Sequence, residues 1–209
     1  MLTPKWEELA GKLRNTVKVA YVDTEAGPTP QQVGQISGTP TIKAFVPRRA
    51  SAKNEKTVVD YDQGREVSDL MRFATGRMPN YVEAPADAAA LAAFSAKAAS
   101  WGLPRVLVLS SKSSGSTSTT LKALSAEYRR RVLLAELKAA RHEALVKRHG
   151  VSSFPTLLCL PADGGDEALH RFENKEASFR RLESFVSKCA LRKPVLKKPA
   201  AAGDGKEEL

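Results

Sequence analysis

The stretch that decides the fold is VLLAELKAARHEALVKRHGVSSFPTLLCL, at residues 132–160. It contains an apolar run, a polar stretch of helical character, and a Pro-Thr step that opens a second apolar run. Residues 17–45, VKVAYVDTEAGPTPQQVGQISGTPTIKAF, repeat this order, and an offset of 115 aligns the two stretches without a gap. A repeat of this length indicates a repeated supersecondary unit, so the sequence predicts two related domains.

Matched positions in the two copies share their chemistry. Apolar residues predict strands at residues 17–22 and 132–137, and each Pro-Thr step precedes a further strand, at residues 41–45 and 156–160. The matched pairs are Val17 with Val132, Val19 with Leu134, Ala20 with Ala135, Val22 with Leu137, Ile36 with Val151, and Pro40-Thr41 with Pro155-Thr156.

The flanking segments follow the same order in both copies. Amphipathic patterns predict a helix ahead of each repeated stretch, at residues 3–15 and around 121–128. After the Pro-Thr strand, each copy has a further strand, at residues 57–61 and 169–172, and a closing helix. A short helix is also expected at residues 28–35.

The two copies differ in what precedes them. The second is preceded by a short strand at residues 81–83, an Ala-rich helix at 87–100 and a strong apolar strand at 106–109. Subtracting 115 from 106 gives a position before residue 1, so the first copy lacks these three elements. We therefore expect a partial domain at residues 1–79, a complete domain at 80–192 and a flexible basic tail at 193–209.

Composition excludes several classes of protein. With 209 residues and no apolar run near 20 residues long, the sequence predicts a soluble chain without a membrane span. The net charge of +10 allows an acidic or nucleic-acid partner, but the basic residues are scattered and no aromatic residues interleave with them. Nucleic-acid binding is therefore the weaker interpretation, and no cofactor or metal site is predicted.

Cysteine and histidine offer few candidate catalytic groups. Only Cys159 and Cys189 occur, in a predicted strand and in the last helix, so a CxxC motif and a zinc pattern are both absent. The sequence favours two buried free thiols, with a disulfide in an oxidising compartment as the alternative. The three histidines, His142, His149 and His170, are expected at the surface.

The order of elements and the Pro-Thr steps resemble the thioredoxin fold. The segments Gly150-Val151-Ser152-Ser153-Phe154-Pro155-Thr156 and Ile36-Ser37-Gly38-Thr39-Pro40-Thr41 are similar to the cis-proline loop of that family. The opening Met1-Leu2-Thr3-Pro4-Lys5-Trp6 is similar to the residues that follow CxxC in protein disulfide isomerases. The resemblance implies an α/β fold with two thioredoxin-like domains, the first truncated at its N-terminus and the second complete.

The resemblance also implies a peptide-binding site at each proline loop. A cis X-Pro bond leaves the backbone of the preceding residue facing outward, where an extended peptide can pair with it. The expected contact residues are Thr39, Pro40, Phe154 and Pro155; a structural turn without a ligand is the alternative for both loops. After its central strand the second copy has serines and threonines in place of a dithiol, so it is expected to be redox-inactive.

The C-terminal residues resemble a signal for cellular location. The last four residues, Lys206-Glu207-Glu208-Leu209, are one step from a KDEL-type retention signal, with an ordinary charged tail as the alternative. This end implies the lumen of the endoplasmic reticulum and a retrieval receptor, with a signal peptide assumed upstream.

These features lead to two main hypotheses about function. In the first, the chain is part of a protein disulfide isomerase-like folding factor that catalyses thiol-disulfide exchange as a whole protein. This chain, which has no CxxC, would bind unfolded or partly folded protein clients. The second hypothesis is a non-catalytic, chaperone-like binding module with thioredoxin-like domains.

Overall fold

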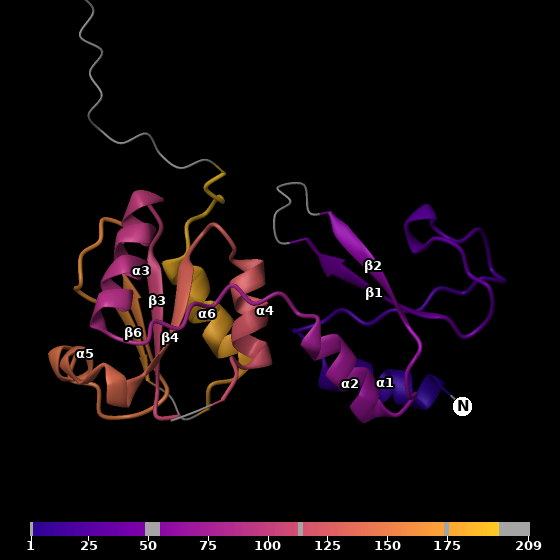
Figure 1. Cartoon of the computed structure of the whole chain (residues 1–209), viewed down its shortest axis with the longest axis horizontal. Helices are drawn as coiled ribbons and strands as arrows, with labels where there is room; N and C mark the ends of the chain where they lie inside the picture. The colour runs from indigo at the N-terminus through magenta and orange to yellow at the C-terminus, as the bar shows by residue number, and fades with distance from the viewer. Residues whose placement is uncertain (1, 49–54, 113–114, 174–175, 197–209) are drawn as a thin grey trace, which may run out of the picture. The chain divides into compact units, whose positions relative to one another are not determined.

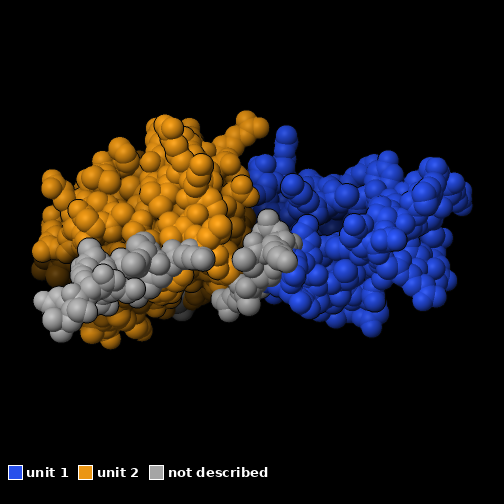
Figure 2. Space-filling view, turned by 90° about the horizontal axis from the view of Figure 1, so that it is seen from above, with its two compact units in different colours: residues 1–79 blue, residues 80–209 orange. Residues whose placement is uncertain are grey.

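The computed structural model describes residues 2–48, 55–112, 115–173 and 176–196. The chain divides into two compact units, Met1–Pro79 (unit 1) and Asn80–Leu209 (unit 2), which are coloured separately in Figure 2. Each unit has its own sheet and its own hydrophobic core. Within the described residues, every helix falls short of the length and apolar character needed to cross a membrane.

Unit 2 is built around the central strand β3 (Arg105–Ser110), which is paired on both edges. Strand β4 (Leu133–Lys138) runs parallel to β3, and β5 (Thr156–Leu160) runs antiparallel on the other side. Strand β6 (His170–Glu173) completes the order β4-β3-β5-β6 (Figure 1). All six residues of β3 are buried, as expected for a strand covered on both faces.

Helices cover both faces of this sheet. Side chains of a strand alternate between its faces, so Val106 and Val108 pack with residues of α4 and α6, whereas Leu107 and Leu109 pack with Phe94 of α3. Figure 1 shows α3 on one side of the sheet and α4 and α6 on the other. The helical segments of unit 2 are α3 (Ala88–Ser100), α4 (Thr119–Glu127), η2 (Ala139–Arg141), α5 (Glu143–Arg148) and α6 (Phe179–Cys189).

Unit 1 has a smaller, one-sided core. Its sheet is the antiparallel pair β1 (Ile42–Pro47) and β2 (Lys56–Tyr61). One face of the pair joins α1 (Thr3–Lys12) and α2 (Val67–Gly76) in a core of Leu9, Leu13, Ile42, Tyr61 and Leu70. The opposite face carries the cross-strand pair Phe45 and Val58, which is exposed. A short 3-10 turn, η1 (Gln31–Val33), lies between α1 and β1.

The predicted strand at residues 17–22 is wrong. These residues form no strand, although their counterparts in unit 2 lie in β4. The difference follows from pairing: β4 is bonded to β3, and the described part of unit 1 contains no counterpart of β3. An apolar run becomes a strand only where a neighbouring backbone takes up its hydrogen bonds.

Three smaller predictions also need correction. The expected helix at residues 28–35 shrinks to η1, and the expected strand at 81–83 shrinks to a single bridge from Glu83 to Ala135. His142 is buried and not at the surface, because its ring packs against the segment before α3. Its Nε2 lies 3.0 Å from the carbonyl oxygen of Pro85, which accepts a hydrogen bond.

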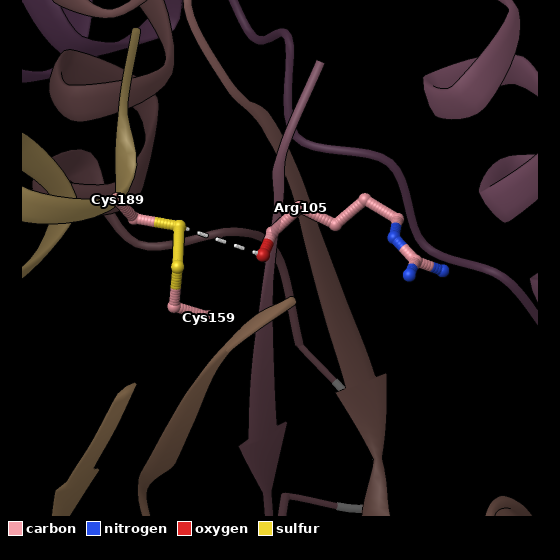
Figure 3. Close-up of a disulfide and its surroundings, with 3 residues drawn as sticks. All are labelled: Arg105, Cys159 and Cys189. Carbon is pink, nitrogen blue, oxygen red and sulfur yellow. Dashed lines mark hydrogen bonds between the residues drawn. A yellow bond between two sulfur atoms is a disulfide. The ribbon is translucent and has the colours of Figure 1, made fainter. Parts of the chain in front are cut away.

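The two cysteines form a disulfide, so the prediction of free thiols is wrong. Cys159 of β5 and Cys189 at the end of α6 have their Cα atoms 5.9 Å apart and are 1% and 9% exposed. Both residues belong to the core that β3 shares with α4 and α6, which brings their side chains together. Figure 3 shows the disulfide beside the first residue of β3, whose carbonyl oxygen lies 3.8 Å from Cys189 Sγ.

Removing this disulfide should destabilise unit 2. The bond joins residues 30 positions apart in the sequence, and closing a loop of that length is worth about 3.6 kcal/mol. We expect the Cys159→Ala/Cys189→Ala variant to lose about that free energy of unfolding, measured by urea denaturation. Reductant should lower the wild-type midpoint and leave the variant unchanged; a wild-type midpoint insensitive to reductant would contradict the assignment.

The two units should also differ in local stability. Unit 2 has a core on both faces of its sheet, whereas unit 1 has one only on the face of α1 and α2. In amide hydrogen exchange on the whole chain, we expect β1 and β2 to exchange at least about tenfold faster than β3 and β5. Equal protection of the two sheets would contradict this prediction, because it would show that a core on one face stabilises β1 and β2 as well as two cores stabilise β3 and β5.

Expressed alone, residues 1–79 should be poorly folded, whereas residues 80–192 should unfold cooperatively.

Candidate functional site

Each unit carries a proline loop immediately before a strand of its sheet. Pro40 precedes β1 and Pro155 precedes β5, and the Thr39–Pro40 and Phe154–Pro155 peptide bonds are both cis. Thr39 and Pro40 are exposed, whereas Phe154 and Pro155 are half-buried. The four predicted contact residues therefore form two separate loops, one in each unit.

The same side-chain hydrogen bond closes both loops. The Thr41 hydroxyl donates to the carbonyl oxygen of Gly38, and the Thr156 hydroxyl donates to the carbonyl oxygen of Ser153. In each case the threonine follows the proline and reaches back three residues. This local bond explains why the Pro-Thr step, and not proline alone, is repeated in the sequence.

Each loop presents unpaired backbone groups. Within the described residues, the backbone N–H and C=O groups of Thr39 and Phe154 have no hydrogen-bond partner. Thr39 lies three residues before β1 and Phe154 two residues before β5, so both lie outside the paired residues of the two sheets. Unpaired backbone groups of this kind can form hydrogen bonds with an extended peptide.

The Pro155 loop lies beside the end of the central strand. The antiparallel register pairs Leu109 of β3 with Thr156 of β5, which puts Ser110 and Pro155 at the same end of the sheet. Ser110 is buried, and its hydroxyl oxygen accepts a hydrogen bond from the backbone N–H of Lys112. The side chain beside this proline is thus a hydroxyl, which cannot exchange disulfides.

No cysteine of this chain lies at either proline loop. The sequence contains two cysteines, and these form the Cys159–Cys189 disulfide. That disulfide lies beside Arg105, at the opposite end of β3 from Ser110 (Figure 3). The chemistry available at the loops is therefore hydrogen bonding and apolar contact.

One positive side chain contacts the Pro40 loop, and another stands at the end of the sheet that carries the Pro155 loop. The Arg65 guanidinium donates to the carbonyl oxygen of Pro40 at 3.5 Å, and Arg65 is exposed. In unit 2, the register pairs Ser110 with Lys138, so that lysine stands at the same end of the sheet as Pro155.

A buried arginine that the sequence did not reveal lies away from the proline loops. Arg105 is fully buried; its Nη2 donates to the carbonyl oxygen of Gly165, and its Nη1 lies 3.7 Å from Asp166 Oδ1. Burial lowers the pKa of this guanidinium, and Asp166 opposes that shift. This polar cluster holds the turn after β5 at the far end of the sheet, so we assign it a structural role. A charged residue opening an otherwise apolar strand was the available signal.

One histidine near this cluster has a perturbed pKa. Burial and the neighbouring Arg148 lower the pKa of His149, and its Nε2 is buried without a hydrogen-bond partner. Arg171 donates to the carbonyl oxygens of His149 and Gly150 and thereby fixes the end of α5. His149 is thus held as a neutral, structural residue, whereas His170 is exposed as predicted.

Sequence comparisons connect the chain with protein disulfide isomerases. No protein-family model matches. The chain is 39% identical over 77 residues to protein disulfide isomerase-like 2-3 of Oryza sativa subsp. japonica, covering 37% of this chain and 16% of that protein. It is 37% identical over 73 residues to protein disulfide-isomerase 2-3 of Arabidopsis thaliana, covering 35% of this chain and 15% of that protein.

A longer match covers most of the chain at lower identity. A Dictyostelium discoideum protein with a provisional protein disulfide-isomerase name is 25% identical over 198 residues, covering 90% of this chain and 44% of that protein. The chain therefore spans less than half the length of each of these relatives.

A solved structure supports the fold. The crystal structure of ERdj5 form II matches 88% of this chain and 24% of that chain, with a TM-score of 0.64 and 16% identity. At this identity the likeness shows the fold alone. Together with the curated relatives, it leads to one conclusion: the chain is related to the protein disulfide isomerases and has their mixed α/β, thioredoxin-like fold.

Proposed function

We propose that this chain binds unfolded or partly folded protein clients, as part of a protein disulfide isomerase-like folding factor of the endoplasmic reticulum. The observation that carries the proposal is the pair of cis-proline loops, in which the backbone groups of Thr39 and Phe154 are unpaired. A client segment in extended conformation would pair with these groups, and its side chains would contact Pro40 or the half-buried Phe154 and Pro155.

The domain organisation that goes with this proposal follows the internal repeat. Residues 80–192 would form a complete thioredoxin-like domain without redox activity, and residues 1–79 would form a partial one. The counterparts under the offset of 115 are α1 with α4, β1 with β5, β2 with β6 and α2 with α6. Residues 193–209 would be a flexible tail; most of it, including the retention-like Lys206-Glu207-Glu208-Leu209, lies outside the described residues.

Three features support the endoplasmic reticulum as the location. The buried Cys159–Cys189 disulfide fits an oxidising compartment, because reducing conditions in the cytosol disfavour such bonds. The curated relatives are named as protein disulfide isomerases, and the C-terminal tetrapeptide is similar to a retrieval address. The retrieval receptor would be a second partner.

Catalysis in the longer protein would need a dithiol outside this chain. A disulfide isomerase works by thiolate attack and a mixed disulfide, and both cysteines here are already bonded to each other in the core. The same observation favours the second candidate function, a non-catalytic, chaperone-like module. The two differ in whether the longer protein carries a CxxC, which its full coding sequence would show.

Truncating Phe154 should weaken client binding. With a fluorescently labelled unfolded peptide and the whole chain, we expect Phe154→Ala to raise the Kd about fivefold, the equivalent of about 1 kcal/mol. The matched control is Leu169→Ala, because Leu169 is 58% exposed and lies far from the loop. Its backbone N–H donates to the carbonyl oxygen of Cys159, near the end of β5 that is opposite Pro155. Fluorescence anisotropy gives the Kd, and urea unfolding checks that both variants are folded. Equal losses in the two variants would contradict binding at the loop.

The chain should also fail as a reductase. Because the described residues contain no free cysteine, we expect no acceleration of insulin reduction by dithiothreitol above the uncatalysed rate. An active thioredoxin serves as the positive control. Acceleration abolished by Cys159→Ala/Cys189→Ala would instead show that the buried disulfide is redox-active.

A further inference from the structure

The Pro155 loop is anchored at both of its ends. Helix α5 is followed by Gly150, whose φ of 55° is the left-handed conformation that commonly ends a helix. Val151 is then buried in the core that includes side chains of α5, and the half-buried Phe154 packs against the same core. Thr156, at the start of β5, is fully buried. Residues 152–155 therefore form a short loop between two buried positions.

Two side chains of β6, Arg171 and Glu173, contact both ends of this loop. The antiparallel register pairs Glu173 with Thr156, and Arg171, two residues away, lies on the same face of the sheet. The Arg171 guanidinium donates through Nη1 to the carbonyl oxygen of His149, and through Nη2 to that of Gly150 at 2.9 Å. Its Nε donates at 2.7 Å to Glu173 Oε1, which lies 3.4 Å from the Thr156 hydroxyl oxygen.

The chemistry of arginine suits this position. The carbonyl groups at the end of a helix have no partner within the helix and carry partial negative charge, so a cation stabilises them. A guanidinium presents several N–H donors in a fixed, planar arrangement, which lets one side chain bond two carbonyl groups and a carboxylate at once. Lysine would supply a single charged nitrogen on a flexible stem.

Unit 1 has an acidic residue at the equivalent position. Under the offset of 115, Leu158 corresponds to Lys43; the partner of Leu158 across the sheet is Arg171, and that of Lys43 is Asp60. Asp60 forms an ion pair with Lys43. Within the described residues, the carbonyl groups at positions 34–35, the counterparts of those that Arg171 bonds, accept no hydrogen bond. The Arg171 contacts therefore distinguish the Pro155 loop from the Pro40 loop.

We propose that Arg171 is a positioning residue for client binding at the Pro155 loop. By bonding the carbonyl groups at the end of α5, it fixes the place where residues 152–155 begin, and through Glu173 it supports Thr156, where the loop joins β5. A loop that already holds its binding conformation loses less conformational freedom when a client binds. The inference rests on the proposed function for its ligand, an unfolded client segment, whereas the contacts themselves do not depend on it.

The first measurement needs no client and reads the loop directly. The backbone N–H groups of Gly150 and Val151 donate to carbonyl oxygens of α5, so their exchange, followed by ¹⁵N NMR on the whole chain, reports how firmly the end of α5 is held. We expect Arg171→Ala to speed exchange at these two amides at least about fivefold, with the amides of β3 changing less than about twofold. Unchanged exchange at both amides would overturn the proposal, and so would an equal acceleration throughout unit 2.

The second measurement is the Kd of the fluorescently labelled unfolded peptide for the whole chain. Arg171→Ala should raise it about threefold or more. The matched control is Arg181→Ala, because it removes an ion pair with Glu176 from α6, which packs on the other face of the sheet from α5. The control should leave the Kd and the two amides unchanged. An equal rise of the Kd in the control would overturn the proposal.

A conservative variant separates positioning of the loop from attraction of the peptide by charge. Arg171→Lys keeps the positive charge, but its single ammonium group cannot bond both carbonyl groups in the geometry of the guanidinium. We therefore expect the Kd of this variant to stay raised and exchange at Gly150 and Val151 to stay fast. A wild-type Kd in Arg171→Lys would show that charge alone matters and would overturn the positioning role.

Phe154→Ala separates failure of this inference from failure of the proposed function. If Phe154→Ala raises the Kd and Arg171→Ala does not, clients bind at the loop without help from Arg171, and this inference alone is overturned. If neither variant changes the Kd, clients do not bind at the Pro155 loop, and the proposed function is overturned together with the inference. A raised Kd in both variants, with fast exchange at Gly150 and Val151 in Arg171→Ala, is the result that we expect.

Discussion

The structure of unit 2 depends on one constraint, that a central strand must be paired on both edges and covered on both faces. Strand β3 meets it fully, with β4 and β5 as neighbours and helices on either side. The two ends of β3 have different neighbours: Ser110 stands beside the Pro155 loop, and Arg105 stands beside the disulfide. Unit 1 shows the consequence of leaving this constraint unmet, because residues 17–22 remain outside any strand and the core has one side.

The proline loops are present in both units, since the hydrogen bond that closes each loop is local. Each is closed by a threonine hydroxyl bonded three residues back, and neither loop needs the central strand for that bond. The unpaired backbone at Thr39 and Phe154 therefore exists in unit 1 and in unit 2 alike. These groups are the basis on which we propose client binding for a chain whose two cysteines are bonded to each other.

The amino-acid sequence predicts the elements whose determinants are local, and it does not predict those that depend on contacts distant in the chain. The strands after the Pro-Thr steps and the closing helices were predicted because periodicity and turn residues specify them directly. The strand at residues 17–22 was wrong, since it requires a partner distant in the sequence. The Cys159–Cys189 bond and the burial of His142 depend on how elements pack, which the spacing of residues does not contain.

The central claim is that clients pair with the backbone at the proline loops, and amide chemical shifts test it most directly. In a titration of the ¹⁵N-labelled chain with an unfolded client peptide, the account predicts the largest shift changes at the amides of Thr39 and Phe154 and of the residues that begin β1 and β5. Saturable changes confined to other surfaces, with these amides unmoved, would contradict it.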